Sequence, residues 1–141
     1  MVSVIMAAFN SEFWIADSID SVRKQTYPQW KLYVVNDGST DNTAGVVEKF
    51  LDDKRIQLIN QENTGPAGAR NCGIKRAQGE FLAFLDADDC WLPDKLAYQL
   101  KYLQSHPEVG LLHTAYRIFH EDPQEGKPFQ DPGWFAEWPM T

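Results

Sequence analysis

The chain has 141 residues, of which 43% are hydrophobic and 23% are charged, and its formal net charge is -7 at pH 7. This composition is typical of a globular protein with one core, and it excludes a disordered chain. The negative charge argues against a protein that binds nucleic acid through a broad basic face. Cys72 and Cys90 lack metal-ligand spacing and are too few for a disulfide framework, so we expect them to be reduced.

No apolar run approaches the roughly 20 residues of a membrane-spanning helix, so the sequence predicts no transmembrane segment. The first residues, MVSVIMAAFN, lack the basic start of a signal peptide and are interpreted as the first strand of a sheet. Their nearly continuous apolar character is typical of a strand that is covered on both faces.

Strand and helix patterns alternate along the chain. Apolar runs predict strands at residues 2–9, 30–36, 56–60, 81–85 and 110–115, and a helical pattern follows each of the first four. This alternation predicts a single Rossmann-like α/β domain of three layers, in which a mostly parallel sheet carries helices on both faces. In open sheets of this kind, ligands bind outside the carboxyl ends of the strands.

Capping signals suggest where the helices begin and end. Asn10 or Ser11 is expected to cap the first helix, and Asp41 the second. The third helix is expected to end near Gln78. The fourth is expected to begin at Pro93, because proline is favoured at the first helical position.

The predicted domain covers residues 1–118, and the character of the chain changes beyond it. Residues 119–141 contain four prolines and no hydrophobic period, so a loosely ordered tail is one interpretation. The other interpretation is the start of an acceptor-side region, in which the aromatic faces of Trp134, Phe135 and Trp138 suit contact with sugars or lipids.

The stretch FLAFLDADDCW, residues 81–91, leads from an apolar strand that we interpret as buried directly into three carboxylates. Side chains alternate along an extended segment, so Asp86 and Asp88 are expected to point to the same side. Such oxygen ligands suit Mg²⁺ or Mn²⁺, and a bound cation would let a diphosphate approach an acidic surface. The alternative is a solvated turn in which Asp88 or Asp89 caps the next helix.

Two further motifs add candidate ligand contacts. In VVNDGSTDNT, Asp37 ends a strand, where its carboxylate can accept hydrogen bonds from a base or from ribose hydroxyls. A capped turn explains residues 38–41 well without any ligand. In NTGPAGARNCGI, glycines lie near a helix start, and Arg70 is the only cation in residues 56–74. Arg70 is interpreted either as a grip on phosphate or on a base carbonyl, or as a solvated helix residue.

Together these segments resemble the inverting family-2 glycosyltransferases of the GT-A fold, over about residues 2–115. The resemblance is carried by SVIMAAFN, SIDSVRKQTYPQWKLYVVNDGSTDNT, ENTGPAGARNCGIKRAQGEFLAFLDADD and WLPDKL, in the order and at the spacing of the family. It implies a nucleotide-sugar-binding domain. The implied binding residues are Ala8, Phe9, Asn10, Asp37, Arg70, Asp86, Ala87 and Asp88, and the implied metal ligands are Asp88, Asp86 and Asp89.

The resemblance also implies a role for these positions. Phe9 lies against the nucleotide base, Asp37 accepts a hydrogen bond from it, and Arg70 lies near the base and the phosphates. Mg²⁺ or Mn²⁺ bridges the diphosphate of a UDP-, GDP- or dTDP-sugar, whose sugar passes with inversion to a hydroxyl of an acceptor glycan or lipid-linked glycan. No catalytic residue is assigned, because the family's base and acceptor elements follow the matched region. We therefore expect the donor-binding part, as a fragment of a longer protein.

Two other functions fit parts of the sequence. A non-catalytic nucleotide-sugar-binding fragment would keep the fold without transferring sugar. A sugar-phosphate nucleotidyltransferase would also need Mg²⁺ and an acidic pair, but AAFNSEFWIADS after the first strand lacks the glycines and cations of its signature. The resemblance implies the cytoplasm as the location, with the inner face of the membrane as the second place, and no nucleic acid partner is expected.

Overall fold

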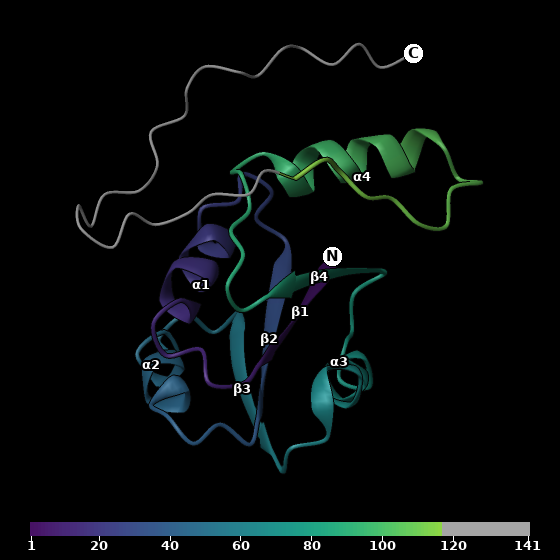
Figure 1. Cartoon of the computed structure of the whole chain (residues 1–141). Helices are drawn as coiled ribbons and strands as arrows, with labels where there is room; N and C mark the ends of the chain where they lie inside the picture. The colour runs from purple at the N-terminus through teal and green to yellow at the C-terminus, as the bar shows by residue number, and fades with distance from the viewer. Residues whose placement is uncertain (117–141) are drawn as a thin grey trace. The chain divides into compact units, whose positions relative to one another are not determined.

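The computed structural model describes residues 1–116, and within it Met1–Val109 form one compact unit (Figure 1). Strands and helices alternate along this unit. In chain order they are β1 (Val2–Ala8), α1 (Ile15–Arg23), β2 (Trp30–Asp37), α2 (Thr43–Glu48), β3 (Ile56–Gln61), α3 (Gly65–Ile74), β4 (Phe81–Asp86) and α4 (Lys95–Ser105). The segment predicted as a tail or acceptor-side region, residues 119–141, lies outside the described residues.

The strands form one parallel sheet in the order β3-β2-β1-β4. In its register, Val2 of β1 lies opposite Trp30 of β2 and Phe81 of β4. The chain steps outward from β1 to β2 and β3, and then returns to the other side of β1 with β4, so the strand order reverses beside β1. A ligand crevice is expected at such a reversal, outside the carboxyl ends of the strands.

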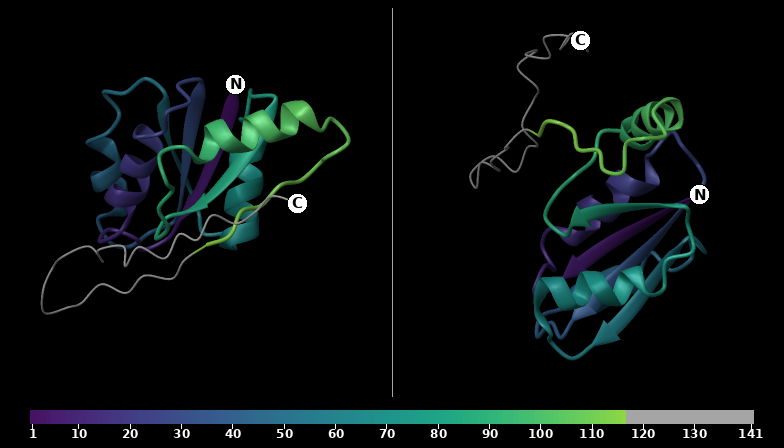
Figure 2. Two further views of the ribbon diagram at one scale, coloured as in Figure 1. Left: turned by 90° about the horizontal axis from the view of Figure 1, so that it is seen from above. Right: turned by 90° about the vertical axis from the view of Figure 1, so that its right-hand side faces the viewer.

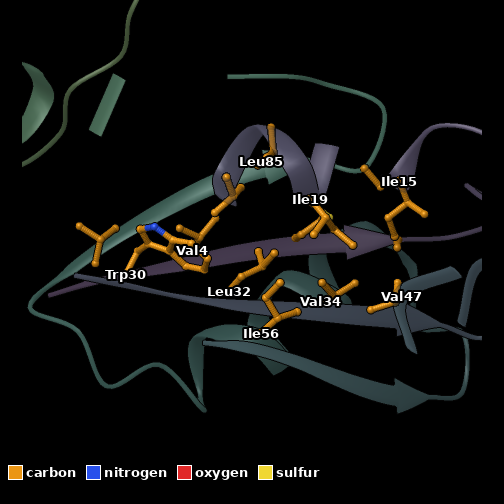
Figure 3. Close-up of a cluster of buried hydrophobic side chains, with 14 of the residues drawn as sticks. Val4, Ile15, Ile19, Trp30, Leu32, Val34, Val47, Ile56 and Leu85 are labelled. Atoms are coloured by element: carbon orange, nitrogen blue, oxygen red, sulfur yellow. The ribbon is translucent and has the colours of Figure 1, made fainter. Parts of the chain in front are cut away.

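Helices cover both faces of the sheet (Figure 1 and Figure 2). On one face, apolar side chains of α1, α2 and α4, among them Ile19, Val47 and Leu96, join those of the strands in one buried cluster (Figure 3). On the other face, α3 packs against β1 and β2. Each fully buried aliphatic side chain contributes about 1.5–3 kcal/mol, so this cluster fixes the positions of the strand ends. The predicted three-layer α/β class is confirmed.

The helix α3 approaches the sheet closely because small residues line its inner side. A Cβ atom added to Gly73 would lie 2.6 Å from Cγ2 of Ile5, which is far closer than two carbon atoms pack. Ala69, one turn earlier, is fully buried. This close packing brings the neighbouring Arg70 within reach of Asp86 at the end of β4.

Two predictions about the later strands are wrong. The strand at 81–85 was expected to be buried, but Leu82 and Phe84 of β4 are 44% and 48% exposed. The reason is that β4 is an edge strand, and α3 packs mainly on β1 and β2. The predicted fifth strand at 110–115 is also not formed, since residues 110–116 carry no strand and Leu111 is 84% exposed. An extended segment without a paired neighbour gains no ladder hydrogen bonds.

The predicted cap of the first helix is wrong as well, because α1 has no side-chain cap and neither Asn10 nor Ser11 serves this purpose. At α2, Asn42 forms no side-chain cap, but Asp41 Oδ1 accepts the N–H of Thr43, the first residue of the helix, at 2.9 Å. Asn10 takes a left-handed conformation, with φ of 49°, and its side chain accepts hydrogen bonds from Thr40. The carboxylate of Asp41 accepts the Glu12 N–H. The side chains of Asn10 and Asp41 therefore link two loops, and Asp41 also holds the first N–H of α2.

The later helix boundaries differ from the prediction by a few residues. α3 ends at Ile74 and does not continue to Gln78. The N–H groups of Gln78 and Gly79 donate to Oγ of Ser3, which draws the chain from the helix back to β1. Pro93 lies just before α4, where its carbonyl accepts a backbone hydrogen bond from the loop after α1.

Cys72 and Cys90 form no disulfide. α4 has 11 residues, and at 1.5 Å per residue it is far shorter than a membrane core is thick. Within residues 1–116, no helix has both the length and the apolar character that crossing a membrane requires.

Candidate functional site

A cleft of about 480 Å³ opens at the carboxyl ends of β1, β2 and β4, where the strand order reverses. Its walls come from these strand ends, from the loop after β1 and from the segment that leads into α3. The lining residues are Ala7, Ala8, Phe9, Ser11, Asp37, Asn63, Gly65, Pro66, Ala69, Arg70, Asp86, Ala87 and Asp88. A more open hollow of about 660 Å³ follows β3 and contains none of the site residues predicted from the sequence.

The cleft brings together most of the predicted binding residues, namely Ala8, Phe9, Asp37, Arg70, Asp86, Ala87 and Asp88. Two predicted residues do not line it. The side chain of Asn10 is engaged with Thr40, and Asp89 lies beyond the lining residues of β4. The parallel sheet explains the gathering, because the carboxyl ends of all its strands lie at one edge.

Asp37 ends β2 as a buried carboxylate that is only 3% exposed. Its Oδ1 accepts hydrogen bonds from Gln61 Nε2 at 2.6 Å, from the Thr64 N–H at 2.9 Å and from the Thr64 hydroxyl at 3.2 Å. Burial acts to raise the pKa of Asp37, but the hydrogen bonds from Thr64 and Gln61 outweigh it, so the pKa is lowered. Asp37 is therefore ionised at neutral pH and held in one orientation.

The three carboxylates after β4 differ in their surroundings. Asp86 forms an ion pair with Arg70, in which Nη2 lies 2.5 Å from Oδ1. Asp88 is exposed and makes no hydrogen bond or ion pair within the described part of the chain. Burial, followed by the charges of Asp88 and Asp86, raises the pKa of Asp89. Ala87 is buried between two exposed aspartates, which agrees with the predicted alternation of side chains.

The loop after β1 is fixed by the loop after β2. The Thr40 N–H donates to Asn10 Oδ1 at 2.8 Å, and the Glu12 N–H donates to Asp41 Oδ2 at 3.1 Å. Phe9 directly precedes these contacts, lines the cleft and is 51% exposed. An exposed aromatic ring on a fixed loop presents a flat apolar face to a flat ligand.

The oxygen donors after β4 suit a divalent cation that a ligand helps to hold. Within residues 1–116, no three His, Cys, Asp or Glu side chains converge as a protein-only metal centre would require. Asp86 is paired with Arg70, whereas Asp88 is free to bind, and the pKa of Asp89 is raised first by burial and then by the charges of Asp88 and Asp86. Mg²⁺ is often held by one or two carboxylates together with substrate phosphates, and this donor set fits that arrangement.

Solved structures of glycosyltransferases have the same fold. The structure of S. aureus TarS 1-349 in complex with UDP has a TM-score of 0.71 and 34% identity, covering 75% of this chain and 32% of that one. The mannosyltransferase PcManGT from Pyrobaculum calidifontis, in complex with GDP-Man and Mn²⁺, has a TM-score of 0.68 and 31% identity, covering 72% and 32%. The fold and the position of the cleft thus define an α/β domain of the GT-A type.

Residues 3–139 match the model of glycosyl transferase family 2, and the chain belongs to this family. It is 41% identical over 127 residues to the UDP-Glc:alpha-D-GlcNAc-diphosphoundecaprenol beta-1,3-glucosyltransferase WfgD of Escherichia coli, covering 90% of this chain and 50% of that protein. It is 38% identical over 124 residues to the putative teichuronic acid biosynthesis glycosyltransferase TuaG of Bacillus subtilis (strain 168), covering 86% and 49%.

The chain spans about half the length of these two relatives. It spans only 32% of the TarS 1-349 chain. The family match also extends beyond the residues that carry the resemblance in the sequence, since the model reaches residue 139. The family and the named relatives are glycosyltransferases, which gives no support to a nucleotidyltransferase.

Sequence reasoning missed the residues that hold Asp37. Gln61 and Thr64 supply the three hydrogen bonds to its Oδ1 described above, and the Gly65 N–H also lowers the pKa of this carboxyl. A signal for Gln61 exists, because a parallel pairing of β2 with β3 puts it opposite Asp37 in the register. Asn63, which lines the cleft, has no such signal, since its place depends on the fold of the loop before α3.

Proposed function

We propose that residues 1–118 form the donor-binding domain of a metal-dependent glycosyltransferase. The reaction would move a sugar from a nucleotide-diphosphate sugar to an acceptor hydroxyl, with inversion at the transferred carbon. The observation that carries this proposal is the single cleft that gathers Phe9, Asp37, Arg70, Asp86 and Asp88 at the carboxyl ends of three strands.

Each of these side chains suits one part of a nucleotide-diphosphate sugar. The exposed ring of Phe9 offers a face for the base, and the ionised Asp37 accepts an N–H from the base edge. Arg70 has five N–H donors, so it can keep its ion pair with Asp86 while it donates to a diphosphate oxygen. The base and the diphosphate would thus lie between the loop after β1 and the start of α3.

The carboxylates after β4 are proposed to hold Mg²⁺ or Mn²⁺ with the help of the diphosphate. Asp88 is the first candidate because it is exposed and free of protein partners within residues 1–116. Asp86 and Asp89 supply further negative charge beside it. When bound, a divalent cation stabilises the charge that develops on the departing nucleoside diphosphate.

The ligands and names of related proteins support this type of donor and suggest a type of acceptor. The TarS structures contain UDP and UDP-GlcNAc, and the PcManGT structure contains GDP-Man and Mn²⁺. WfgD is described as acting on a diphosphoundecaprenol-linked sugar with UDP-Glc. We propose by analogy that the acceptor is a hydroxyl of a glycan or of a lipid-linked glycan.

The test is calorimetric titration of the chain with UDP, GDP and dTDP, each with and without Mn²⁺. We expect at least one of these nucleotides to bind, and to bind much more tightly with Mn²⁺, because the cation removes the repulsion between the diphosphate and the acidic cleft. Binding that ignores Mn²⁺ contradicts the metal part of the proposal. Failure of all three nucleotides to bind contradicts the proposal as a whole.

Asp88→Asn is the matching variant, with Asp52→Asn as its control. Asp52 is also an exposed aspartate, but it does not line the cleft. We expect the first change to remove the effect of Mn²⁺ on nucleotide binding and the second to leave it intact. Equal effects of both changes would show that overall charge, and not a site at Asp88, governs binding.

A further inference from the structure

The strand β3 forms one edge of the sheet, and its outer side is open (Figure 2). Within residues 1–116 no strand pairs with that side, and the hollow of about 660 Å³ follows the strand along residues 56–60. Natural edge strands are commonly protected from pairing with another chain by a charge, a proline or a bulge. The sequence of β3, IQLINQ, contains neither a charged residue nor a proline. This edge is therefore suited to accept a further strand.

The backbone of β3 presents hydrogen-bonding groups on its outer side. The N–H of Leu32 in β2 donates to the C=O of Arg55 at 2.8 Å. Successive residues of a strand direct their backbone groups to alternate sides, so every second residue after Arg55 faces β2, and Ile56, Leu58 and Asn60 face outward. The Ile56 N–H is already bonded within the turn before the strand. The C=O of Ile56 and both groups of Leu58 and Asn60 remain for a partner.

Only a few registers allow β3 to pair with β3 of a second copy about a two-fold axis. Directly opposed residues of an antiparallel pair point to the same face of the sheet. An axis at right angles to the sheet preserves the faces, so it must pass through a residue. With the axis at Leu58, the N–H and C=O of Leu58 bond to those of the partner's Leu58, and the Asn60 N–H bonds to the partner's Ile56 C=O. This register uses the outward-facing groups of the strand.

The same register brings opposite charges together. Lys54 and Glu62 are equally far from Leu58 along the chain, so each Lys54 comes close to the partner's Glu62. Both side chains are exposed, and neither forms an ion pair within residues 1–116. An axis at Ile59 would instead place the apolar Ile56 opposite the partner's Glu62. Charge and backbone hydrogen bonding therefore select the same register.

The other edge of the sheet, β4, is opposed to pairing with a copy of itself. Leu82 and Phe84 are 44% and 48% exposed, so hydrophobicity alone would favour pairing there. With an axis at Phe84, however, Glu80 comes close to the partner's Asp88, and an axis one residue earlier brings Glu80 close to the partner's Asp86. Like charges that lie directly opposite one another destabilise a strand pair. The charges thus distinguish the two edges and favour β3.

We propose that two copies of this chain associate in solution by antiparallel pairing of their β3 strands, with Leu58 on the two-fold axis and Lys54 of each copy beside the partner's Glu62. The contact joins two four-stranded sheets into one. Antiparallel pairing turns the carboxyl ends of the two sheets in opposite directions, so the two clefts lie at opposite edges and the association does not depend on the proposed function. A contact of one short strand is smaller than a standard interface, so we expect weak, reversible association at micromolar concentrations.

The test is analytical ultracentrifugation of the full chain from low to high micromolar concentration, without nucleotide or Mn²⁺. We expect the weight-average mass to rise from that of one chain toward that of two. Added salt should raise the dissociation constant, because it screens the pairs of Lys54 and Glu62. A single-chain mass at every concentration overturns the inference. Growth beyond two chains also overturns it, because a two-fold contact closes on itself.

Charge exchange tests the register. Lys54→Glu and Glu62→Lys each place like charges together at both ends of the contact, so we expect the dissociation constant to rise about tenfold. The double variant Lys54→Glu/Glu62→Lys restores opposite charges and should recover the affinity of the unchanged chain. Lys101→Glu makes the same change in net charge at an exposed position of α4 and should have no effect.

These substitutions are at exposed positions, so we expect every variant to fold, which circular dichroism checks. Equal weakening by Lys54→Glu and Lys101→Glu would mean that overall charge governs association, and it overturns the β3 contact. Failure of the double variant to recover the affinity overturns the register with Leu58 on the axis.

Discussion

Arg70→Gln tests whether the ion pair at the cleft serves ligand binding or stability. The side chains of Arg70 and Asp86 are 37% and 51% exposed, so solvent screens their attraction. For such a pair we expect the free energy of unfolding to fall by less than about 1 kcal/mol. Glutamine keeps a polar side chain at this position, which limits any change in packing.

The same change removes the positive charge that is proposed to meet the diphosphate. A hydrogen bond to a charged group contributes about 1.5–3 kcal/mol, which corresponds to roughly 10- to 150-fold weaker binding. We therefore expect the dissociation constant of UDP, measured by calorimetry with Mn²⁺, to rise by this factor. Urea denaturation of the same preparation gives the free energy of unfolding.

Arg23→Gln is the matched control. Arg23 pairs with Asp20 at 3.2 Å, with both side chains 41% exposed, and it does not line the cleft. We expect the same small change in stability and no change in UDP affinity. The assignment of Arg70 to the diphosphate is refuted if its replacement leaves UDP affinity unchanged, or if the protein loses well over about 1 kcal/mol of stability and the pair proves structural.

Three further predictions concern other parts of the unit. Asp88→Asn should leave the urea midpoint unchanged or slightly raised, because it reduces repulsion among like charges, and a clear fall would make Asp88 a structural residue. Asp37→Asn should lower the free energy of unfolding at pH 7 by about 1–2 kcal/mol, since charge-assisted hydrogen bonds become neutral ones. The folded-state pKa of Asp37 is lowered, so its stabilisation is present above its unfolded pKa of about 4 and is lost as the pH falls through the folded value. The difference in free energy of unfolding between Asp37→Asn and the unchanged chain should therefore shrink in acid. A constant difference from pH 7 to pH 3 would contradict this prediction. Gly73→Ala places a Cβ atom 2.6 Å from Ile5 Cγ2. The clash, about 1–3 kcal/mol, should outweigh the helix preference of alanine, about 1 kcal/mol, so we expect the melting temperature to fall. A raised melting temperature would show that α3 moves away freely.

The sequence predicted the sheet and the edge that carries the site. Apolar runs such as the one in β1 mark strands, and their alternation with helical patterns leaves few topologies. Because parallel strands end at one edge, Asp37 and Asp86 could be placed near each other although they lie far apart in the chain. This part of the prediction needed only periodicity and chain order.

The local contacts could not be predicted in the same way. Asn10 has the residue type of a helix cap, but its partner Thr40 lies 30 residues away and becomes a neighbour only in the fold. Asp41 bonds the nearby Thr43, as its residue type indicates, but its contact with the Glu12 N–H again depends on the fold. The exposure of Leu82 and Phe84 depends on which strands α3 covers, and hydrophobicity does not encode that. The pairing of Arg70 with Asp86 depends on how closely α3 approaches the sheet.

The hydrogen bonds between the two loops at the cleft also bear on how such enzymes can be recombined. Residues 10–12 and 39–43 each supply donors that only the other segment accepts. A chimaera that exchanges one segment with a relative leaves amide groups of the other without partners and displaces the ring of Phe9. Segment exchange aimed at a new donor sugar must therefore transfer both loops as one unit.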